Sequence, residues 1–383
     1  MQHRRKDRRR VLLPVGATAA AVAVALAGAL LIKMKSEDGD DTDRNTSTAP
    51  PAVARADCAK QGKVPGSGST AQQNAMKRWI KEYERSCPGV RIAYNPVGSG
   101  AGVNQFLLGG FTAFGGTDGA LKPVDVEQSR AVCPGGRAID LPMVGGPIAI
   151  GYNLPGVNGL VMDAPTLAKI FDSRITQWND RAIQQLNPGV NLPNLSIKAV
   201  HRSDDSGTTQ NLNAYLAGAA PAQWPYPAEK SWQGKGGSSA DRSDGVVSEV
   251  TSSVGAIGYF ELSFATARKI DTVRIDTGAA EPVEASTTTA SAGIAAAEVI
   301  GKGKDLTLKF DYDTLAAGAY PIVLVTYEIV CDRGNDKEVL PALKSFLAYT
   351  ASEEGQEILP EIHYAPLPEN VAEQVRGVVA TLS

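Results

Sequence analysis

The deciding stretch of this chain reads His201-Arg202-Ser203-Asp204-Asp205-Ser206-Gly207-Thr208-Thr209. It follows a short strand-like run at 197–200 and precedes a helix-like run at 210–218. A helix N-terminus exposes unpaired N–H groups and carries about half a positive charge, so it attracts anions. Ser206 and Thr208 add hydroxyl donors, and Gly207 lets an anion approach the main chain. Arg202 offers a planar fork of donors. The stretch indicates an oxyanion-binding turn, and an ordinary capped helix with a surface ion pair is the alternative.

Three upstream junctions repeat the order of strand, glycine turn and helix. The segment 63–70 precedes an amphipathic run at 71–86, 90–102 precedes 103–108, and 114–118 precedes 123–131. This order is typical of open parallel α/β sheets, whose ligands lie outside the carboxyl ends of the strands. Hydroxyl side chains stand at the helix starts (Ser69, Thr70 and Ser99), and Asp118 adds a carboxylate. We expect these turns to share one site with Arg202.

Two long apolar runs, at 141–153 and 320–330, are suited to cross between two lobes. A chain of 383 residues is too long for one minimal core, which also favours two lobes. The segment 279–301 is rich in Ala, Ser and Thr, and this composition predicts a peripheral helix.

Composition and motifs exclude several classes of function. The formal net charge of −3 argues against nucleic acid as a partner, because phosphate backbones attract strongly basic surfaces. Neither a Walker motif nor a Gly-x-Gly-x-x-Gly fingerprint occurs, so no nucleotide cofactor is expected. The chain has 3 histidines, without metal-ligand spacing or a Ser–His–Asp set. We therefore expect no enzyme and no cofactor; a phosphate-ester hydrolase that uses His201 as acid or base is the alternative considered.

The N-terminus combines a basic segment with an apolar one. Residues 1–10 contain six Lys or Arg side chains, and 11–32 is an uncharged run that is long enough to span a bilayer. Basic residues in front of such a run keep that end in the cytoplasm, which places the rest of the chain outside. Lys33 and Lys35 follow directly, which favours an uncleaved single-pass anchor; a cleaved signal peptide followed by secretion is the alternative. An acidic and then Thr/Pro/Ala-rich segment follows and predicts a flexible linker.

Four cysteines in an exported region predict two disulfides, for which three pairings are possible. Cys58 and Cys87 each precede a predicted strand, so both are expected at the same end of a sheet. This position favours Cys58–Cys87, and Cys133–Cys331 is then the pair that remains.

Several pieces of the chain together resemble the PstS family, the phosphate-binding proteins of the high-affinity phosphate ABC importer. The pieces occur in order and cover almost all of the exported region: 66–70, 98–102, 114–118, 153–156, 175–180, 186–189, 202–208, 255–259 and 320–322. The resemblance implies a type II periplasmic-binding-protein-like α/β fold, in which two lobes each hold a mixed sheet flanked by helices. It also implies permease and ATPase subunits as partners and no catalytic activity.

The resemblance divides the chain into a cytoplasmic segment, an anchor, a linker and two lobes. The expected bounds are 1–10, 11–32 and 33–62 for the first three, 63–143 and 322–383 for lobe I, and 144–321 for lobe II.

The resemblance also implies the residues that bind phosphate: Thr70, Ala71, Ser99, Asp118, Arg202, Ser206, Gly207 and Thr208, with Asp204 holding Arg202. Ala71 stands where the family often has phenylalanine, although its backbone donor is kept. Asp205 stands where the family often has glycine.

Asp118 distinguishes phosphate from other oxyanions. Phosphate still carries a proton near neutral pH, and an ionised Asp118 can accept the hydrogen bond from that proton. Sulfate carries no proton, so it has no donor to offer to the buried carboxylate, and the two negative charges would repel each other. Two alternatives remain open at this stage: a binding protein for sulfate or molybdate, and a phosphate sensor or surface module that is not coupled to transport.

Overall fold

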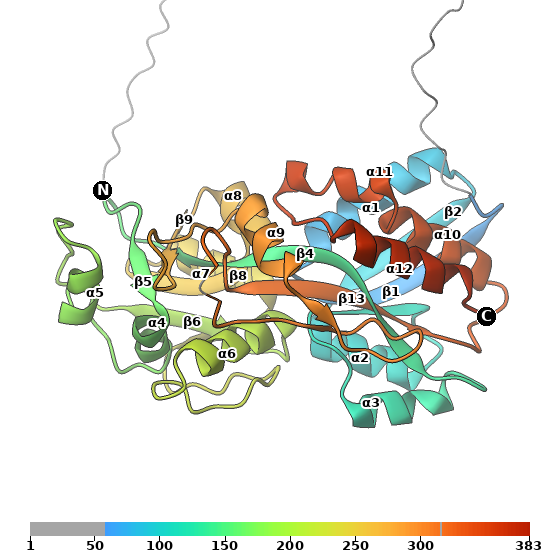
Figure 1. The fold of residues 1–383 in the computed structure, drawn as a ribbon, viewed down its shortest axis with the longest axis horizontal. Helices are drawn as coiled ribbons and strands as arrows, with labels where there is room; N and C mark the ends of the chain where they lie inside the picture. Colours follow the sequence, from blue (N-terminus) through green and yellow to red (C-terminus); the bar gives the residue numbers. More distant parts are fainter. Residues whose placement is uncertain (1–57, 315) are drawn as a thin grey trace, which may run out of the picture. The chain divides into compact units, whose positions relative to one another are not determined.

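The computed structural model describes residues 58–314 and 316–383, and a nine-stranded sheet forms the centre of this part (Figure 1). The strand order is β2-β1-β3-β13-β4-β8-β6-β7, and β9 pairs with β4. β1 (Gly62–Gly68) pairs in parallel with β2 (Val90–Pro96) and with β3 (Phe114–Thr117). β6 (Lys198–Arg202) likewise pairs in parallel with β7 (Ser238–Ala240) and β8 (Ala256–Glu261). The predicted parallel strands are therefore present at both ends of the sheet.

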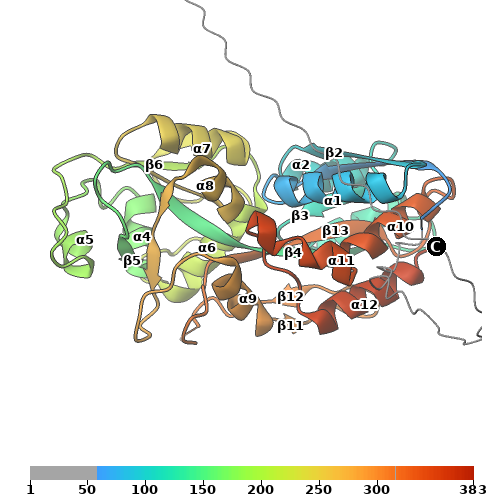
Figure 2. The same cartoon turned by 90° about the horizontal axis from the view of Figure 1, so that it is seen from above.

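Two long strands join these parallel groups and make the sheet mixed. β4 (Ala138–Tyr152) pairs antiparallel with β13 (Val323–Cys331) up to Pro147, and then with β8 from Ile148 onward. Every residue of both strands is buried, which explains why their sequences are apolar without alternation. In Figures 1 and 2, β4 and β13 run from the β1–β3 group toward the β6–β8 group.

Helices cover the β1–β3 group from two sides. α1 (Gln73–Ser86) packs against β2, and α10 (Leu340–Thr350) packs against β1 and α12 (Glu369–Ala380). α2 (Ser99–Leu108) packs on β1 and β3 and contacts α3 (Pro123–Gln128), which a 3₁₀ turn, η1 (Ser129–Ala131), follows. A short helix, α11 (Glu353–Glu357), and a second 3₁₀ turn, η2 (Pro360–Ile362), lie between α10 and α12 in the sequence.

The second group of helices surrounds β6 and β8. α6 (Gly207–Ala219) packs against α4 (Ala164–Phe171), and α7 (Arg242–Ser252) packs on β6 and β8. α5 (Arg181–Leu186) packs on β5 (Val161–Asp163), and α8 (Leu262–Arg268) packs on β4 and β8. Trp178 is fully buried there.

The predicted peripheral helix at 279–301 is wrong in its extent. Only α9 (Thr287–Ala295) is helical, and it packs on β4 and β13. Ser286 accepts a hydrogen bond from the Thr289 amide and so fixes the helix start, and residues 279–285 are not helical. The remaining strands are short: β9 (Asp271–Thr272), β10 (Arg274–Asp276), β11 (Glu298–Val299) and β12 (Leu308–Lys309).

Both favoured disulfides are confirmed. Cys58 is bonded to Cys87 and Cys133 to Cys331, with Cα–Cα distances of 5.4 Å in each case. The first bond fixes the start of the described chain beside the end of α1, so Cys58–Gly62 is held in place within the predicted linker, and β1 begins at Gly62.

The predicted anchor at 11–32 lies outside the described residues, as does the linker before Cys58. Among the residues that are described, the structure contains no helix with the length and apolar character needed to span a membrane.

Candidate functional site

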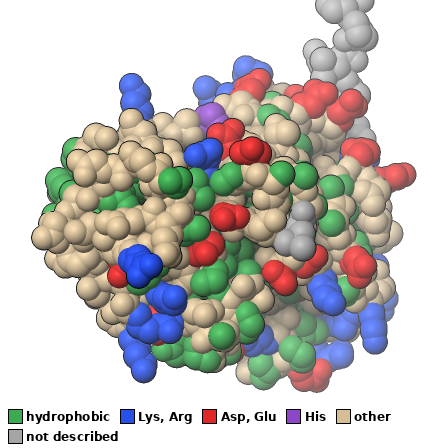
Figure 3. All heavy atoms as spheres, turned by 60° about the vertical axis from the view of Figure 1, so that its left-hand side comes forward, with side chains coloured by type: hydrophobic (Ala, Val, Ile, Leu, Met, Phe, Trp, Pro, Cys, Tyr) green, Lys and Arg blue, Asp and Glu red, His purple; other side chains and the backbone are tan. Residues whose placement is uncertain are grey.

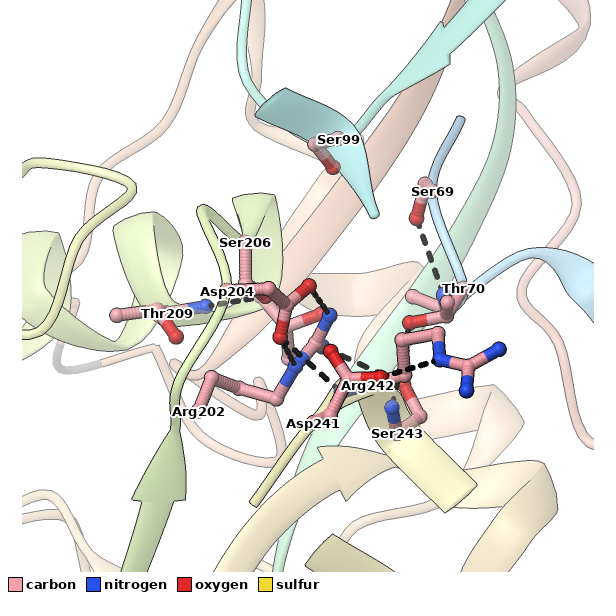
Figure 4. Close-up of polar contacts among 12 residues, drawn as sticks. Ser69, Thr70, Ser99, Arg202, Asp204, Ser206, Thr209, Asp241, Arg242 and Ser243 are labelled. Atoms are coloured by element: carbon pink, nitrogen blue, oxygen red, sulfur yellow. Dashed lines mark hydrogen bonds and ion pairs between the residues drawn. The ribbon is translucent and has the colours of Figure 1, made fainter. Parts of the chain in front are cut away.

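The starts of four helices meet beside the end of β3. They are the N-termini of α1, α2, α6 and α7, and Figure 4 shows residues that precede or begin them: Thr70, Ser99, Ser206 and Ser243. Each helix N-terminus presents unpaired amides and partial positive charge, so their convergence favours a bound anion. The sequence stretches around Thr70, Ser99 and Ser206 are thus brought together as expected.

Asp118 lies at the centre of three hydroxyl donors. Thr326 Oγ1 donates to Asp118 Oδ1 at 2.8 Å, and Thr208 Oγ1 and Ser99 Oγ donate to Oδ2 at 3.3 and 3.4 Å. Asp118 is only 3% exposed. Burial raises the pKa of its carboxyl group, and hydrogen bonds from Ser69 and Thr326, together with the charge of Arg202, oppose this shift. A carboxylate has about four acceptor positions, so a new donor, such as a hydroxyl group of a ligand, takes the place of one of these side-chain hydroxyls.

Arg202 is buried and is held by Asp204. Its Nε and Nη2 atoms donate to the two carboxylate oxygens of Asp204 at 2.6 and 2.5 Å, a bidentate pair. The Arg202 side chain is 2% exposed, and burial without this partner would strongly destabilise its charge. The hydrogen bonds and charge of Arg202 lower the pKa of Asp204 against the opposing effect of burial. Arg202 Nη1 lies 3.5 Å from Ser243 Oγ and remains directed toward the helix starts.

Ser206 and Gly207 begin α6. The Ser206 hydroxyl accepts a hydrogen bond from the Thr209 amide, which is an N-cap interaction. Gly207 touches Asp118 and Ser99 so closely that a Cβ atom at residue 207 would lie 2.6 Å from Asp118 Cβ and 2.8 Å from Ser99 Oγ. Glycine is needed at this position because no side chain fits between α6 and β3.

Thr70 contacts the site through Ser243, a residue that the sequence analysis did not identify. Thr70 Oγ1 lies 2.8 Å from Ser243 Oγ at the start of α7, so it connects the α1 turn to Arg202 (Figure 4). Ser243 lies in a polar, glycine-rich segment at 233–244, and this composition, like that around Ser206, is a signal that could have identified it. Thr326 was also missed, and nothing in the apolar run of β13 marks this threonine as a contact of Asp118.

His201 is held in an aromatic stack and not among groups that could assist catalysis. Its ring stacks on Trp232 with centroids 4.8 Å apart and an interplanar angle of 5°. Burial lowers the pKa of the imidazole. Within residues 58–314 and 316–383, no three His, Cys, Asp or Glu side chains are grouped so as to hold a metal ion.

The chain is similar to known proteins over most of its length. A family model described as "PBP superfamily domain" matches residues 51–354. Phosphate-binding protein PstS 3 of Mycobacterium leprae (strain TN) is 44% identical over 324 residues, which span 84% of this chain and 87% of the relative. Phosphate-binding protein PstS 2 of Mycobacterium tuberculosis (strain ATCC 25618 / H37Rv) is 41% identical over 331 residues, which span 85% of this chain and 89% of that protein. The chain belongs to the PstS family of phosphate-binding proteins.

The fold of this PstS-family chain also matches a solved structure. The high-affinity periplasmic phosphate-binding protein PfluDING, bound with phosphate, superposes with a TM-score of 0.69 at 20% identity, covering 82% of this chain and 93% of that chain. The expected periplasmic-binding-protein-like fold is therefore confirmed.

Ala71 and Asp205, the two residues at which the resemblance leads us to expect a different side chain, both lie beside the helix starts. The amide of Ala71 donates to Ser69 Oγ at 3.0 Å, and the Ala71 side chain is fully buried in the core. The exposed Asp205 provides its backbone oxygen, which accepts a hydrogen bond from the Gly100 amide at 2.9 Å. Asp205 thus links the start of α2 to the turn before α6.

Proposed function

We propose that this chain binds inorganic phosphate outside the cytoplasm and delivers it to the permease and ATPase of an ABC importer, without catalysing a reaction. One observation carries the proposal: four helix starts and Arg202 meet around a single buried carboxylate, Asp118. Many donors around one acceptor match an oxyanion that still carries a proton. The two relatives described above are named phosphate-binding proteins, which supports the same ligand.

Each predicted site residue has a role in this proposal. Oxygens of phosphate accept hydrogen bonds from Arg202, from hydroxyl groups and from amides at the helix starts; the residues are Thr70, Ala71, Ser99, Ser206, Gly207 and Thr208, and Ser243 joins them. A hydroxyl has one hydrogen, so Ser99 and Thr208, whose hydroxyls donate to Asp118 in this structure, bind phosphate through their backbone amides or turn their hydroxyls from Asp118 to the ion. Asp118 accepts the hydrogen bond from the phosphate hydroxyl. Asp204 holds the guanidinium of Arg202 in place. Sulfate lacks the proton that Asp118 requires, so its binding is opposed by a buried negative charge.

Closure of two lobes around the ion is part of the same proposal. We divide the chain into lobe I, at 63–143 and 322–383, and lobe II, at 144–321, with β4 and β13 as the connections between them. Side chains of α1 meet lobe II at two points: Gln73 Nε2 donates to Asp244 Oδ2 at 3.0 Å, and Asn74 Nδ2 donates to Ser263 Oγ at 2.9 Å. These contacts support a closed form in which the ion is removed from water. A hinge motion that breaks them would admit and release phosphate.

Isothermal titration of the full chain, first stripped of bound phosphate, tests the proposal. We expect heat on titration with phosphate, and we expect that excess sulfate or molybdate does not compete. Heat with sulfate and none with phosphate would overturn the assignment. Reconstitution with the permease and ATPase in vesicles then tests delivery, because a sensor or surface module would bind phosphate without supporting its uptake.

A further inference from the structure

A second acidic side chain, Glu328, lies inside the sheet below the phosphate site. It stands on β13, where its backbone pairs with Gly116 of β3 and Leu141 of β4. Its side chain is fully buried. Neither carboxyl oxygen has a hydrogen-bond partner among the described residues. An ionised carboxylate in such a place is strongly destabilised, whereas a carboxylic acid is tolerated.

The amide of Gln72 lies over the same part of the sheet. A Cβ atom on Gly116, directly opposite Glu328, would lie 2.4 Å from both Gln72 Nε2 and Tyr94 Oη. Gln72 Nε2 donates to Tyr94 Oη at 3.0 Å, and Tyr94 Oη donates to the backbone oxygen of Ser69 at 2.9 Å. Gln72 Oε1 is buried and has no donor in the described part of the chain. The Gln72 amide is also within hydrogen-bonding reach of Glu328, so the two side chains that carry these unpartnered oxygens lie next to each other.

The charged surroundings of Glu328 are consistent with a neutral acid. Burial is the main cause that raises the pKa of Glu328; a hydrogen bond from the Gln72 side chain opposes this shift, and the negative charge of Asp118, which follows β3, adds to it. Tyr94 on β2 is the other titratable neighbour, and burial together with Glu328 raises the pKa of its hydroxyl. On β4 the residue opposite Glu328 is Leu141, and the Asp140 carboxylate accepts instead from the Leu121 amide and from Thr307. The first turn of α1 contains no acidic residue.

We propose that Glu328 is a positioning residue of the phosphate site, which holds a proton in the folded protein and donates it to the amide oxygen of Gln72. Through Gln72 and Tyr94 this hydrogen bond fixes Ser69, the residue before Thr70 at the start of α1. A neutral Glu328 also leaves Asp118 as the acceptor of the phosphate proton without a second negative charge beside it. This inference rests on the proposed function, since it concerns the same anion.

The proposal has a consequence for pH. When Glu328 loses its proton at alkaline pH, a negative charge appears close to Asp118 and to the bound anion, and Gln72 loses its donor. Phosphate affinity should therefore decrease as the pH rises through the ionisation of Glu328. Replacement by glutamine keeps the shape and a donor but cannot ionise, so it should remove this part of the pH dependence.

Titration calorimetry with inorganic phosphate on the full-length wild type, Glu328→Gln and Glu328→Met, from about pH 6 to about pH 10, tests the proposal. We expect Glu328→Gln to bind within about twofold of wild type at neutral pH and to keep its affinity at alkaline pH where wild type loses it. Glu328→Met, which has no donor for Gln72, should bind about tenfold more weakly even at neutral pH. The ionisation of phosphate itself affects all three proteins equally, so it cancels in the ratio of affinities.

Glu261→Gln is the matched control, because it removes another buried acid near Asp118. In this variant the loss of phosphate affinity that Glu328 causes at alkaline pH should remain.

Infrared spectroscopy measures the proton directly. The wild type should show the carbonyl band of a protonated carboxylic acid at neutral pH, and this band should be absent from both Glu328 variants. Equal pH profiles for wild type and Glu328→Gln, or no acid band lost in either variant, would overturn the inference. Failure of wild type to bind phosphate at any pH would instead refute the proposed function, and the infrared band would still report whether Glu328 is protonated.

Discussion

Asp118 and Arg202 place opposite charges in one buried site, and each is held by different partners. Asp204 uses two of the donors of Arg202, while three hydroxyls donate to Asp118. In the function proposed above, the guanidinium attracts any oxyanion, whereas the carboxylate admits only one that can donate a hydrogen bond. Affinity and selectivity therefore depend on different residues.

Asp118→Asn tests this separation. The amide is neutral and can donate to an oxygen of sulfate, so we expect measurable sulfate binding. Phosphate affinity should fall by about 10- to 100-fold, the effect of losing one hydrogen bond to a buried charge. Competition calorimetry with the two anions measures both changes. Asp205→Asn is the control, since it removes a nearby exposed charge without touching the acceptor; unchanged selectivity in Asp118→Asn would exclude Asp118 from this role.

Glu261 should make the folded chain less stable as the pH rises. Burial raises the pKa of this carboxyl group from 4.5 to about 8. Between these values the folded chain binds a proton that the unfolded chain has lost, so stability decreases with pH, by at most about 1.4 kcal/mol per pH unit. In Glu261→Gln this decrease should be smaller across that window.

Urea unfolding at stepped pH values measures this effect. The control is Glu249→Gln, because Glu249 is an exposed partner of Lys198 and its removal should leave the slope of stability against pH unchanged. A slope in Glu261→Gln equal to that of wild type would show that Glu261 is ionised in the folded protein.

At the scale of secondary structure, the sequence predicted the helices near the site but placed two of their starts too late. α6 begins at Gly207 and α2 at Ser99, several residues before the apolar periodicity that marked them. Glycine and hydroxyl residues disfavour helix interiors, so propensity alone assigned these segments to the turns. In the folded chain, other backbone segments lie close to these residues, and this packing favours their helical conformation as the first turns of α2 and α6. The helix starts at the proposed site therefore include more residues than the sequence indicated.

The start of α6 allows a direct test of this close approach. In Gly207→Ala the added methyl group would meet backbone and side-chain atoms of Asp118, so the start of α6 must move away from β3. We expect phosphate affinity to fall by about 10- to 100-fold, the range of overpacking effects.

Gly377→Ala is the matched control, because Gly377 lies within α12 and a Cβ atom there meets nothing within 4 Å. That control should gain about 0.5–1 kcal/mol of stability and keep its affinity. Calorimetry and thermal unfolding of both variants distinguish a local clash from a general effect of replacing glycine. Normal phosphate binding by Gly207→Ala would contradict the predicted clash.

For the whole molecule, strand direction was the feature that the sequence left least determined. Repeated strand–turn–helix units correctly predicted the parallel groups, and the two long apolar runs correctly predicted β4 and β13. That β13 returns antiparallel between β3 and β4 depends on contacts between residues far apart in the sequence, which local periodicity does not contain. For the same reason Thr326 could not be identified: its role depends on which strand lies beside β3.

Charge on the molecular surface is mixed. The chain has 38 Lys or Arg and 41 Asp or Glu residues, and Figure 3 shows both signs on one face, with neither covering it. Because positive and negative side chains are mixed on this face, its electrostatic field does not attract the anion. The selectivity proposed above therefore depends on the buried site.

Closure of the two proposed lobes predicts that ion pairs across the cleft slow the release of phosphate. Lys122 and Glu229 form such a pair, with Nζ and Oε2 2.6 Å apart and side chains 50% and 40% exposed. Lys122 precedes α3, and the backbone oxygen of Glu229 accepts a hydrogen bond from Asn213 of α6. The pair therefore joins the loop after Asp118 to the helix that begins with Gly207.

An exposed ion pair contributes about 0.2–1 kcal/mol, so Lys122→Glu or Glu229→Lys should speed the release of phosphate by about 1.5- to 5-fold. The double reversal should restore the wild-type rate, and high salt should reduce all these differences. Stopped-flow release kinetics measures each rate, and reversal of Lys198–Glu249, a pair within lobe II, is the control that should change nothing. If the double reversal releases phosphate as fast as the single variants, the pair does not stabilise the closed form.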